Sequence, residues 1–255
     1  MTENELKQAA TELLNRRVAG TKADRLEESI RPISADDALQ IQQQMIQLRA
    51  DTVGGWKCLQ PIAEDQFIVA PIFSDTIQQG GQCALFADNG VVRIEPEIAF
   101  VLGKDLPAQQ EDYSKAQIDE AIASSHMALE LMQGRYADGI DVPFNEKLAD
   151  GLLNQGLFIG PEISKSDAYN ASKINITVKQ GEQKQQFAGT HPNTLPQIPL
   201  YWLINFMSKR GSSFKAGEAI ITGSYAGIVE VAFAQPTEIE YENLGKYTVE
   251  FKAIK

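Results

Sequence analysis

Two glutamates separated by one residue lie in an apolar stretch of the chain, and a third lies in a later one. Glu95 and Glu97 belong to Ile94-Glu95-Pro96-Glu97-Ile98, and Glu130 to Leu129-Glu130-Leu131. Side chains at positions i and i+2 of a strand point to the same face, so we expect Glu95 and Glu97 side by side. An anion among apolar residues is costly to bury unless a cation compensates it. Because an all-oxygen ligand set suits Mg²⁺, Mn²⁺ or Ca²⁺ rather than zinc, the three acids predict a hard-metal site.

Two other interpretations of these acids stay open on the sequence alone. A Glu-x-Glu pattern on an edge strand is commonly a solvated face that discourages aggregation. A buried Arg or Lys would compensate Glu130 as well as a metal would. Pro96 lacks a backbone donor and therefore predicts an edge strand or a bulge. The apolar neighbours Ile94, Ile98 and Phe100 favour burial of the segment, and with it the metal interpretation.

Composition and charge exclude several classes of protein. The chain has 255 residues, 43% hydrophobic and 22% charged, which is ordinary for a globular domain. A net charge of −11 disfavours nucleic acid as a partner, because phosphate binding needs a basic surface. No apolar run approaches the ~20 residues of a membrane span, and the first residues lack a signal-peptide pattern. Cys58 and Cys83 have no zinc-ligand spacing. We therefore expect a cytoplasmic protein that binds neither membranes nor nucleic acids.

The elements that must position the acids follow from hydrophobic periodicity. Apolar spacing over residues 6–14 predicts a first helix, and a second begins at Ser34 and ends before Gly54. Strand-like runs then alternate with turn residues, at 56–59, 67–72, 91–102, 127–132, 157–159, 174–178, 219–222, 229–233, 237–241 and 247–251. Two further helices are predicted, from residue 114 to about 125 and from 199 to about 209. The order predicts a single α+β domain, 1–255, with a helical N-terminal lobe (1–80) and a β-rich catalytic core (81–255) whose sheets are mostly antiparallel.

A series of short motifs in a fixed order resembles one enzyme family. They are Gly55-Trp56-Lys57, Ala70-Pro71-Ile72-Phe73, the Glu-Pro-Glu segment, Ala128-Leu129-Glu130 followed by Gly134-Arg135, residues 148–156, Lys215-Ala216-Gly217 and Ile221-Thr222-Gly223-Ser224. From about residue 6 to residue 251 the chain resembles the 2-oxopent-4-enoate (2-keto-4-pentenoate) hydratase / 4-oxalocrotonate decarboxylase family of the fumarylacetoacetate hydrolase superfamily. The resemblance implies a fumarylacetoacetase C-terminal-like mixed β-roll that holds the active site beside a helical N-terminal lobe.

The resemblance also implies roles for the acids and for one lysine. Mg²⁺ or Mn²⁺ is expected at the acids that match Glu95, Glu97 and Glu130. A 2-oxo acid offers two adjacent oxygens that chelate such a cation, which then stabilises the enolate. Lys57 matches the acid–base lysine of the family. A partly desolvated lysine beside a dication is expected to have a lowered pKa, suited to proton transfer at neutral pH.

Other polar residues match the substrate side of the family pattern. Arg135 is either an anchor for a substrate carboxylate or a structural ion-pair partner, and the sequence favours neither. Thr222 and Ser224 match a loop near the substrate, although turn hydroxyls most often bind local backbone groups. His191, in a turn without a nucleophile motif, is expected to be a loop residue, and His126 a packing residue.

The expected activity is that of a metal-dependent hydro-lyase of aromatic catabolism. Its substrate would be a small anionic 2-hydroxydienoate or 2-oxo acid, and we expect a homo-oligomer. Two alternatives are decarboxylation of a 2-oxo-enoate and C–C hydrolysis of an acylpyruvate, which requires a His/Glu pair. A non-catalytic metabolite-binding homologue is a third, supported by the departures from the family pattern at Gln60-Pro61 and Gln133-Gly134. The chain also departs from that pattern at residues 151–155. Those departures affect the substrate side of the site rather than its metal side.

Overall fold

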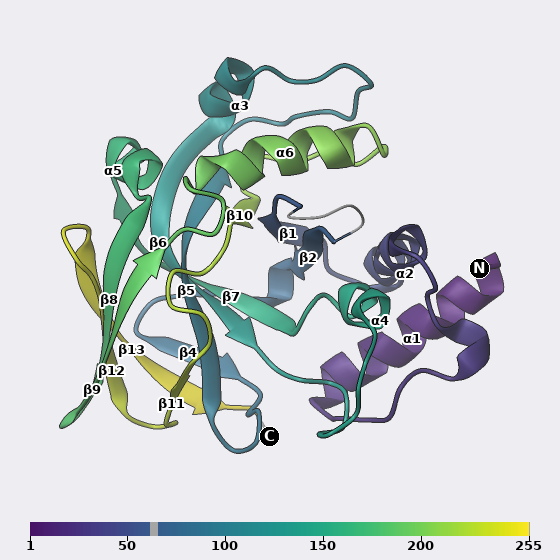
Figure 1. Ribbon diagram of the computed structural model, residues 1–255, viewed down its shortest axis with the longest axis horizontal. Coiled ribbons are helices and arrows are strands. Elements are labelled where there is room, and N and C mark those ends of the chain that lie inside the picture. The colour runs from purple at the N-terminus through teal and green to yellow at the C-terminus, as the bar shows by residue number, and fades with distance from the viewer. Residues whose placement is uncertain (62–65, 255) are drawn as a thin grey trace.

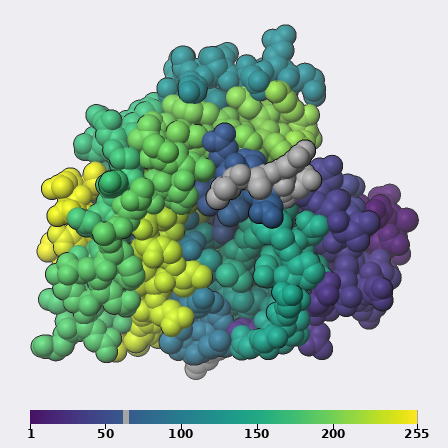
Figure 2. Space-filling model, in the orientation of Figure 1, coloured from purple at the N-terminus to yellow at the C-terminus, as the bar shows by residue number. Residues whose placement is uncertain are grey.

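The chain begins with helices that pack at one side of the molecule. The computed structural model describes residues 1–61 and 66–254. Helices α1 (Glu3–Ala19) and α2 (Ala35–Leu48) flank the short helix η1 (Glu28–Ile30). The hydroxyls of Thr2 and Ser34 each close a capping box, which satisfies the first backbone N–H groups of α1 and α2. Both helices lie at the end of the molecule opposite the yellow C-terminal strands (Figures 1 and 2).

The larger sheet carries the acidic segments. Within the described residues it has eight strands, in the order β2-β1-β10-β5-β6-β7-β3, with β11 also paired to β5. The strands are β1 (Val53–Leu59), β2 (Ile68–Phe73), β3 (Ile77–Gln79), β5 (Val92–Leu102), β6 (Ile122–Met132), β7 (Asn154–Ile163), β10 (Ala219–Ile221) and β11 (Val229–Val231). The β1·β10 and β3·β7 pairs are parallel and the others antiparallel. The two longest strands, β5 and β6, therefore lie next to each other in the middle of the sheet.

The smaller sheet packs beside β5 and β6 (Figure 1). Its five strands within the described residues run in the order β4-β13-β12-β8-β9. They are β4 (Gln82–Leu85), β8 (Lys173–Gln180), β9 (Gln183–Thr190), β12 (Pro236–Tyr241) and β13 (Gly245–Ala253). Alternate residues of β8 are buried, as expected for a strand with one face on the core. The buried apolar side chains of the sheets and helices form one large cluster, and a smaller cluster lies on the larger sheet around Ala99, Ala128 and Ile221.

The remaining helices of the described chain pack against the sheets and the N-terminal helices. They are α3 (Lys115–Ala121), α4 (Phe144–Ala149), α5 (Lys165–Asn170), α6 (Gln197–Ser208) and the single turn η2 (Ser74–Thr76). Figure 1 shows α4 beside the N-terminal helices and α6 near α3 at the top of the view, where α6 packs against β1. No helix among the described residues is long and apolar enough to cross a bilayer.

The α+β class is confirmed, but two predicted boundaries are wrong. The helical segment ends at Leu48, and residues 53–79 contribute strands to the larger sheet, so the helical lobe does not reach residue 80. The third helix ends at Ala121 rather than near residue 125, because β6 begins at Ile122. Pairing with β5 along its whole length draws this segment into the sheet, where tertiary contacts override local helix propensity.

The expectation that Pro96 marks an edge or a bulge is also wrong. Residue 96 pairs regularly with Leu129 of β6 in the interior of the sheet. On its other side, β5 pairs with β10 only at residues 99–101 and with β11 only at 92–94. The carbonyl of Pro96 faces the interval between them, where it accepts the N–H of Tyr225. A central strand tolerates proline here because the ladder is interrupted on the side that proline faces.

Candidate active site

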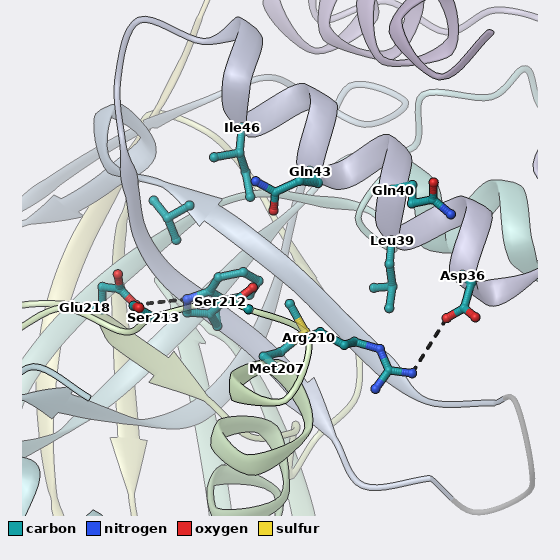
Figure 3. A pocket seen from close by; sticks show the side chains of 13 residues that line it. Asp36, Leu39, Gln40, Gln43, Ile46, Met207, Arg210, Ser212, Ser213 and Glu218 are labelled. Atoms are coloured by element: carbon teal, nitrogen blue, oxygen red, sulfur yellow. Dashed lines mark hydrogen bonds and ion pairs between the residues drawn. The ribbon is translucent and has the colours of Figure 1, made fainter. Parts of the chain in front are cut away.

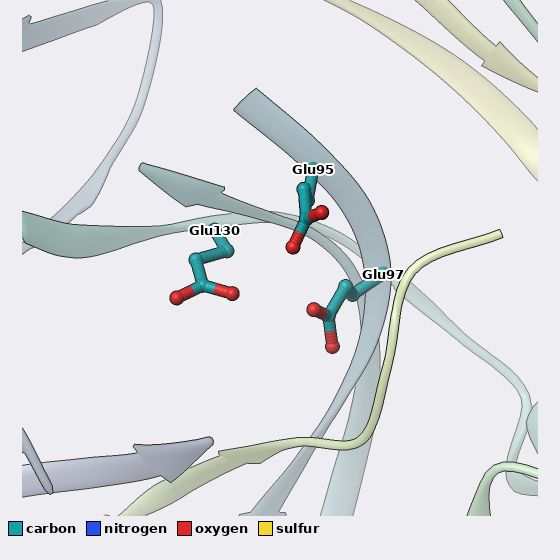
Figure 4. A group of neighbouring side chains, drawn as sticks. All are labelled: Glu95, Glu97 and Glu130. Atoms are coloured by element: carbon teal, nitrogen blue, oxygen red, sulfur yellow. The ribbon is translucent and has the colours of Figure 1, made fainter. Parts of the chain in front are cut away.

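The three predicted acids converge at one point of the β5–β6 pair. Glu95 and Glu130 are directly opposite each other in the antiparallel register, and Glu97 follows Glu95 on the same face. One carboxylate oxygen from each residue lies within 4.8 Å of the others. Figure 4 shows Glu95 and Glu97 on one strand, turned toward Glu130 on its neighbour. The i, i+2 pattern and the strand register are sufficient to produce this convergence.

Burial makes the cluster electrostatically unfavourable without a cation. Glu97 and Glu130 are 2% and 0% exposed. Burial and the Glu130 carboxylate raise the pKa of Glu95 to about 7, and the same causes hold the pKa of Glu97 well above its usual range. Glu130 Oε2 is buried without a hydrogen-bond partner among the described residues. Two buried carboxylates and a partly buried third, with one unsatisfied oxygen, fit a hard divalent cation, which would supply the missing charge and ligand contact.

Two neighbours orient the carboxylates. The backbone N–H of Gly223 donates to Glu97 Oε2 at 2.6 Å, and Asn154 Nδ2 donates to Glu130 Oε1 at 2.9 Å. Gly223 has φ of +120°, and a Cβ there would lie 2.6 Å from Leu59 Cδ2. Only glycine can therefore bring its amide this close to Glu97. Groups that orient ligands in this way are a common feature of metal sites.

Lys57 lies in the same cluster. From β1 its Nζ approaches Glu130 Oε1 at 2.7 Å and donates to the carbonyl of Leu152 at 3.1 Å. The expected lowering of its pKa does not follow from these residues alone. Burial lowers the pKa of Lys57, but the carboxylates of Glu130, Glu95 and Glu97 outweigh this effect and raise it. A lowered pKa at Lys57 therefore requires a cation that neutralises the carboxylates.

A cavity of about 240 Å³ opens onto the cluster. Its lining residues are Lys57, Cys58, Leu59, Ile68, Glu95, Glu97, Glu130, Pro192, Gly223, Ser224 and Gly227. The wall away from the carboxylates is mostly apolar. The cavity therefore combines an oxygen-rich floor with a small hydrophobic wall, as small-molecule sites commonly do.

A larger cavity, of about 610 Å³, lies between α2 and the residues that follow α6 (Figure 3). Trp56 lines it and donates its indole N–H to Glu218 at 2.9 Å. Trp56 and Lys57 are consecutive on β1, so their side chains point to opposite faces of the strand. The larger cavity therefore lies behind β1, away from the three carboxylates.

The structure separates the other predicted site residues. Ser224 lines the small cavity, and its Oγ lies near the carbonyls of Pro96 and Gly227. Arg135 is completely buried outside the cavity lining, and its Nε donates to both carboxylate oxygens of Asp150, at 2.8 and 2.9 Å. Of the two roles left open for Arg135, these contacts support the structural ion pair. Thr222 is fully buried beside the site, and its hydroxyl has no partner among the described residues.

Neither histidine lines the small cavity. His191 is buried against the ring of Tyr225, and burial lowers its pKa to about 4. It is a loop residue, as expected, and it is packed rather than exposed. His126 contacts Ser124 and the carbonyl of Gly160 on β6 and β7. Within the described residues, the His/Glu pair that acylpyruvate hydrolysis requires is not present at this cavity.

The sequence did not identify every group that contributes to the site. Asn154, Gly223 and the carbonyl of Leu152 were noted only within motifs, without roles. Asn154 could have been singled out as one of two consecutive side-chain amides, with Gln155, where the turn enters a strand. A backbone carbonyl or N–H carries no such signal, because every residue has one.

Family comparisons agree with this geometry. The family model for the fumarylacetoacetate (FAA) hydrolase C-terminal domain matches residues 64–251. The chain belongs to this family. A 2-keto-4-pentenoate hydratase of Paraburkholderia xenovorans is 25% identical, with 99% of this chain and 97% of the relative covered. A 2-hydroxyhexa-2,4-dienoate hydratase of Comamonas testosteroni is 26% identical over 62% of this chain and 60% of its own.

Solved structures show the same fold. The 4-oxalocrotonate decarboxylase from Pseudomonas putida G7, complexed with magnesium and adipate, matches with a TM-score of 0.80. It is 16% identical, and 99% of each chain is covered. Its complex with calcium and acetate matches with a TM-score of 0.78. The resemblance inferred from the motifs is confirmed for the fold and the family.

Proposed function

We propose that this protein is a divalent-metal-dependent hydratase that adds water to a short 2-hydroxydienoate and releases a 4-hydroxy-2-oxo acid. The observation that carries the proposal is the convergence of Glu95, Glu97, Glu130 and Lys57 on one small cavity. The names of the relatives support the same reaction class. In this reaction the hydroxyl of water adds to C4, while C3 and C5 each gain a proton and the enol oxygen loses one.

The residues of the cavity have distinct tasks in this reaction. Glu95, Glu97 and Glu130 would hold a cation, which would supply Lewis-acid stabilisation of the charge that develops on the substrate. Lys57 moves a proton at the substrate, because its Nζ is the titratable donor nearest to the carboxylates. Asn154 and Gly223 hold Glu130 and Glu97 in place. Ser224 contributes a hydroxyl at the cavity wall.

The shape and charge of the cavity support hydration over decarboxylation. Among the residues that line it in the described part of the chain, Lys57 is the only cation. Residues 62–65, outside the described part, have the sequence Ile-Ala-Glu-Asp, which adds no Lys or Arg. Leu59, Ile68 and Pro192 would therefore meet the far end of the substrate with apolar surface. A second carboxylate, as in 4-oxalocrotonate, would be desolvated without a partner.

Finer parts of the proposal rest on the family resemblance. Either Mg²⁺ or Mn²⁺ would bind at the three carboxylates, because both ions favour oxygen ligands. We also propose a homo-oligomer located in the cytoplasm and acting in aromatic catabolism.

A substrate panel tests the proposed function. With Mg²⁺, the purified protein should remove the ultraviolet absorbance of 2-hydroxypenta-2,4-dienoate, and EDTA should stop the reaction. 4-Oxalocrotonate should release CO₂ more slowly than the dienoate is hydrated, and acylpyruvates should remain intact. Pyruvate formed from an acylpyruvate would instead indicate a hydrolase. No turnover of any of these substrates, with Mg²⁺ still bound, would indicate a non-catalytic homologue.

A further inference from the structure

The turn between α4 and β7 has an unusual backbone. Gly151, Leu152 and Leu153 have φ of +82°, +54° and +69°, so three consecutive residues are left-handed. Glycine adopts this conformation readily, but leucine pays a steric cost for it. Such a conformation persists only where the surrounding structure holds it, and it commonly occurs at functional sites.

This turn supports two groups of the proposed active site. The carbonyl of Leu152 accepts a hydrogen bond from Lys57 Nζ at 3.1 Å. Asn154, directly after the turn, donates to Glu130 Oε1 at 2.9 Å. A displacement of the turn would therefore move the carbonyl that binds Lys57 and the amide that binds Glu130 together.

One guanidinium from the N-terminal helix connects the two ends of the turn. Arg17, on α1, donates through Nη2 to the carbonyl of Asp150 at 2.7 Å and through Nη1 to the carbonyl of Asn154 at 2.6 Å. Arg17 is 6% exposed. A Cβ at residue 151 would lie 2.9 Å from Arg17 Nη2, so glycine at this position admits the guanidinium. Figure 1 shows α1 running alongside α4 and the start of β7.

Arg135 also holds this turn, but only at its beginning. Its Nε binds the Asp150 carboxylate, and its Nη2 donates to the Asp150 carbonyl at 3.0 Å. The Asn154 carbonyl accepts a hydrogen bond from the side chain of Arg17. Arg17 is thus placed to fix the distance between residues 150 and 154, which Arg135 does not span.

We infer that Arg17 is a positioning residue of the active site, whose forked guanidinium holds residues 151–153 in the conformation that aligns Lys57 and Glu130. The inference rests on the proposed function for its activity readout, but its structural content does not depend on the substrate. It makes the N-terminal helix part of the active site, although that helix lies outside the segment that the family model matches.

The neighbouring arginine provides a matched control. Arg16 is on the same helix and is 5% exposed. Its Nε pairs with Glu12 at 2.8 Å, and its guanidinium lies over the ring of Tyr136. It makes no side-chain hydrogen bond to residues 150–154. A purely structural contribution of a buried arginine on α1 should therefore appear in Arg16→Met and Arg17→Met alike.

Hydrogen–deuterium exchange, Mg²⁺ titration and kinetics on these variants test the inference. In Arg17→Met, exchange should accelerate in residues 148–156 but not in β5 or β6, and Mg²⁺ affinity should fall about three- to tenfold. The value of kcat should fall about 10- to 100-fold with KM changed less than threefold, in the range found when an outer-shell partner of a metal site is lost. Arg16→Met should change none of these.

Arg17→Lys keeps the charge but not the fork, and it serves if Arg17→Met does not fold. It should show the same localised exchange and an intermediate kcat, because a single ammonium cannot reproduce the paired N–H geometry. Equal effects of the Arg16 and Arg17 variants would overturn the inference, as would unchanged exchange in residues 148–156. If the wild type shows no hydratase activity but exchange in residues 148–156 still differs between Arg17→Met and the wild type, only the proposed function is refuted.

Discussion

At the scale of single residues, the candidate site is a balance of buried charges. Glu95, Glu97 and Glu130 bring three carboxylates together, and Lys57 brings one ammonium. The ammonium compensates Glu130 most directly, so the remaining negative charge must be met by protonation or by a cation. The raised pKa values of Glu95 and Glu97 express this competition between protons and a metal.

Replacing Glu97 with glutamine should separate stability from activity. The amide oxygen can still accept the N–H of Gly223, while the buried negative charge is removed. The metal-free variant should be more stable than the wild type by about 1–3 kcal/mol, measured by urea unfolding. Its hydratase activity should be abolished. A variant less stable than the metal-free wild type would show that the three carboxylates do not repel one another as described.

Replacing Lys57 with methionine should remove proton transfer while leaving the metal ligands in place. The stem of the side chain can pack as before, so we expect kcat to fall by roughly 10²–10⁴. Mg²⁺ affinity should not weaken, because Lys57 is not a ligand and competes for Glu130. Isothermal titration and initial rates measure the two effects separately. An unchanged kcat would assign Lys57 a structural role.

At the scale of elements, the smaller sheet supports the strands of the site. The hydroxyl of Tyr241, on β12, lies 2.7 Å from the carbonyl of Ala128 and 3.1 Å from the carbonyl of Glu97. The β6·β7 ladder shifts register between residues 126 and 128. Tyr241 thus satisfies backbone groups of β5 and β6 beside the position where the pairing of β6 with β7 becomes irregular.

Tyr241→Phe should destabilise the protein by about 1–2 kcal/mol, since it leaves buried carbonyls without that donor. Urea unfolding with an unchanged m-value measures this. As a control, Tyr113→Phe removes an exposed hydroxyl that donates to Pro107, and its effect should stay within about 0.5 kcal/mol. Equal effects of the two substitutions would contradict the supporting role of Tyr241.

The sequence predicted those parts of the site that depend on periodicity. Alternation placed Glu95 and Glu97 on one face, and the apolar neighbours of Glu130 indicated its burial. The sequence could not predict contacts between distant segments, such as that of Arg17 with Asn154 or that of Tyr241 with Ala128. Pro96 was misjudged because the sequence does not show that β5 is left unpaired on one side between its pairings with β11 and β10. The end of the helix at Ala121 was missed for the same reason, since pairing with β5 decides it.

At the scale of the whole molecule, buried acids link stability to pH. Burial raises the pKa of Glu218 to about 7, although the indole N–H of Trp56 partly offsets this. The folded protein therefore holds this proton at pH values where the unfolded chain has lost it. The contribution of Glu218 is most favourable below the unfolded pKa of about 4.5, and it declines as the pH rises to about 7.

Glu218→Gln should reduce that decline. The variant keeps an acceptor for Trp56 but has no proton to lose. Its free energy of unfolding, relative to that of the wild type, should therefore increase between about pH 5 and pH 8. This increase is at most about 3 kcal/mol, because the pKa of Glu218 rises from about 4.5 in the unfolded chain to about 7 in the folded protein. Urea unfolding at both pH values measures it, with the exposed Glu240→Gln as control. Parallel pH profiles of the wild type and Glu218→Gln would disprove the assignment.

The central claim, that the three glutamates hold one divalent cation, is tested most directly by titration with Mn²⁺ followed by electron paramagnetic resonance. Wild-type protein should bind one Mn²⁺ per chain, and Mg²⁺ should displace it. Glu97→Gln, with unchanged circular dichroism, should lose this binding. Equal stoichiometry and affinity in the wild type and the variant would show that the cation, and the chemistry that depends on it, lies elsewhere.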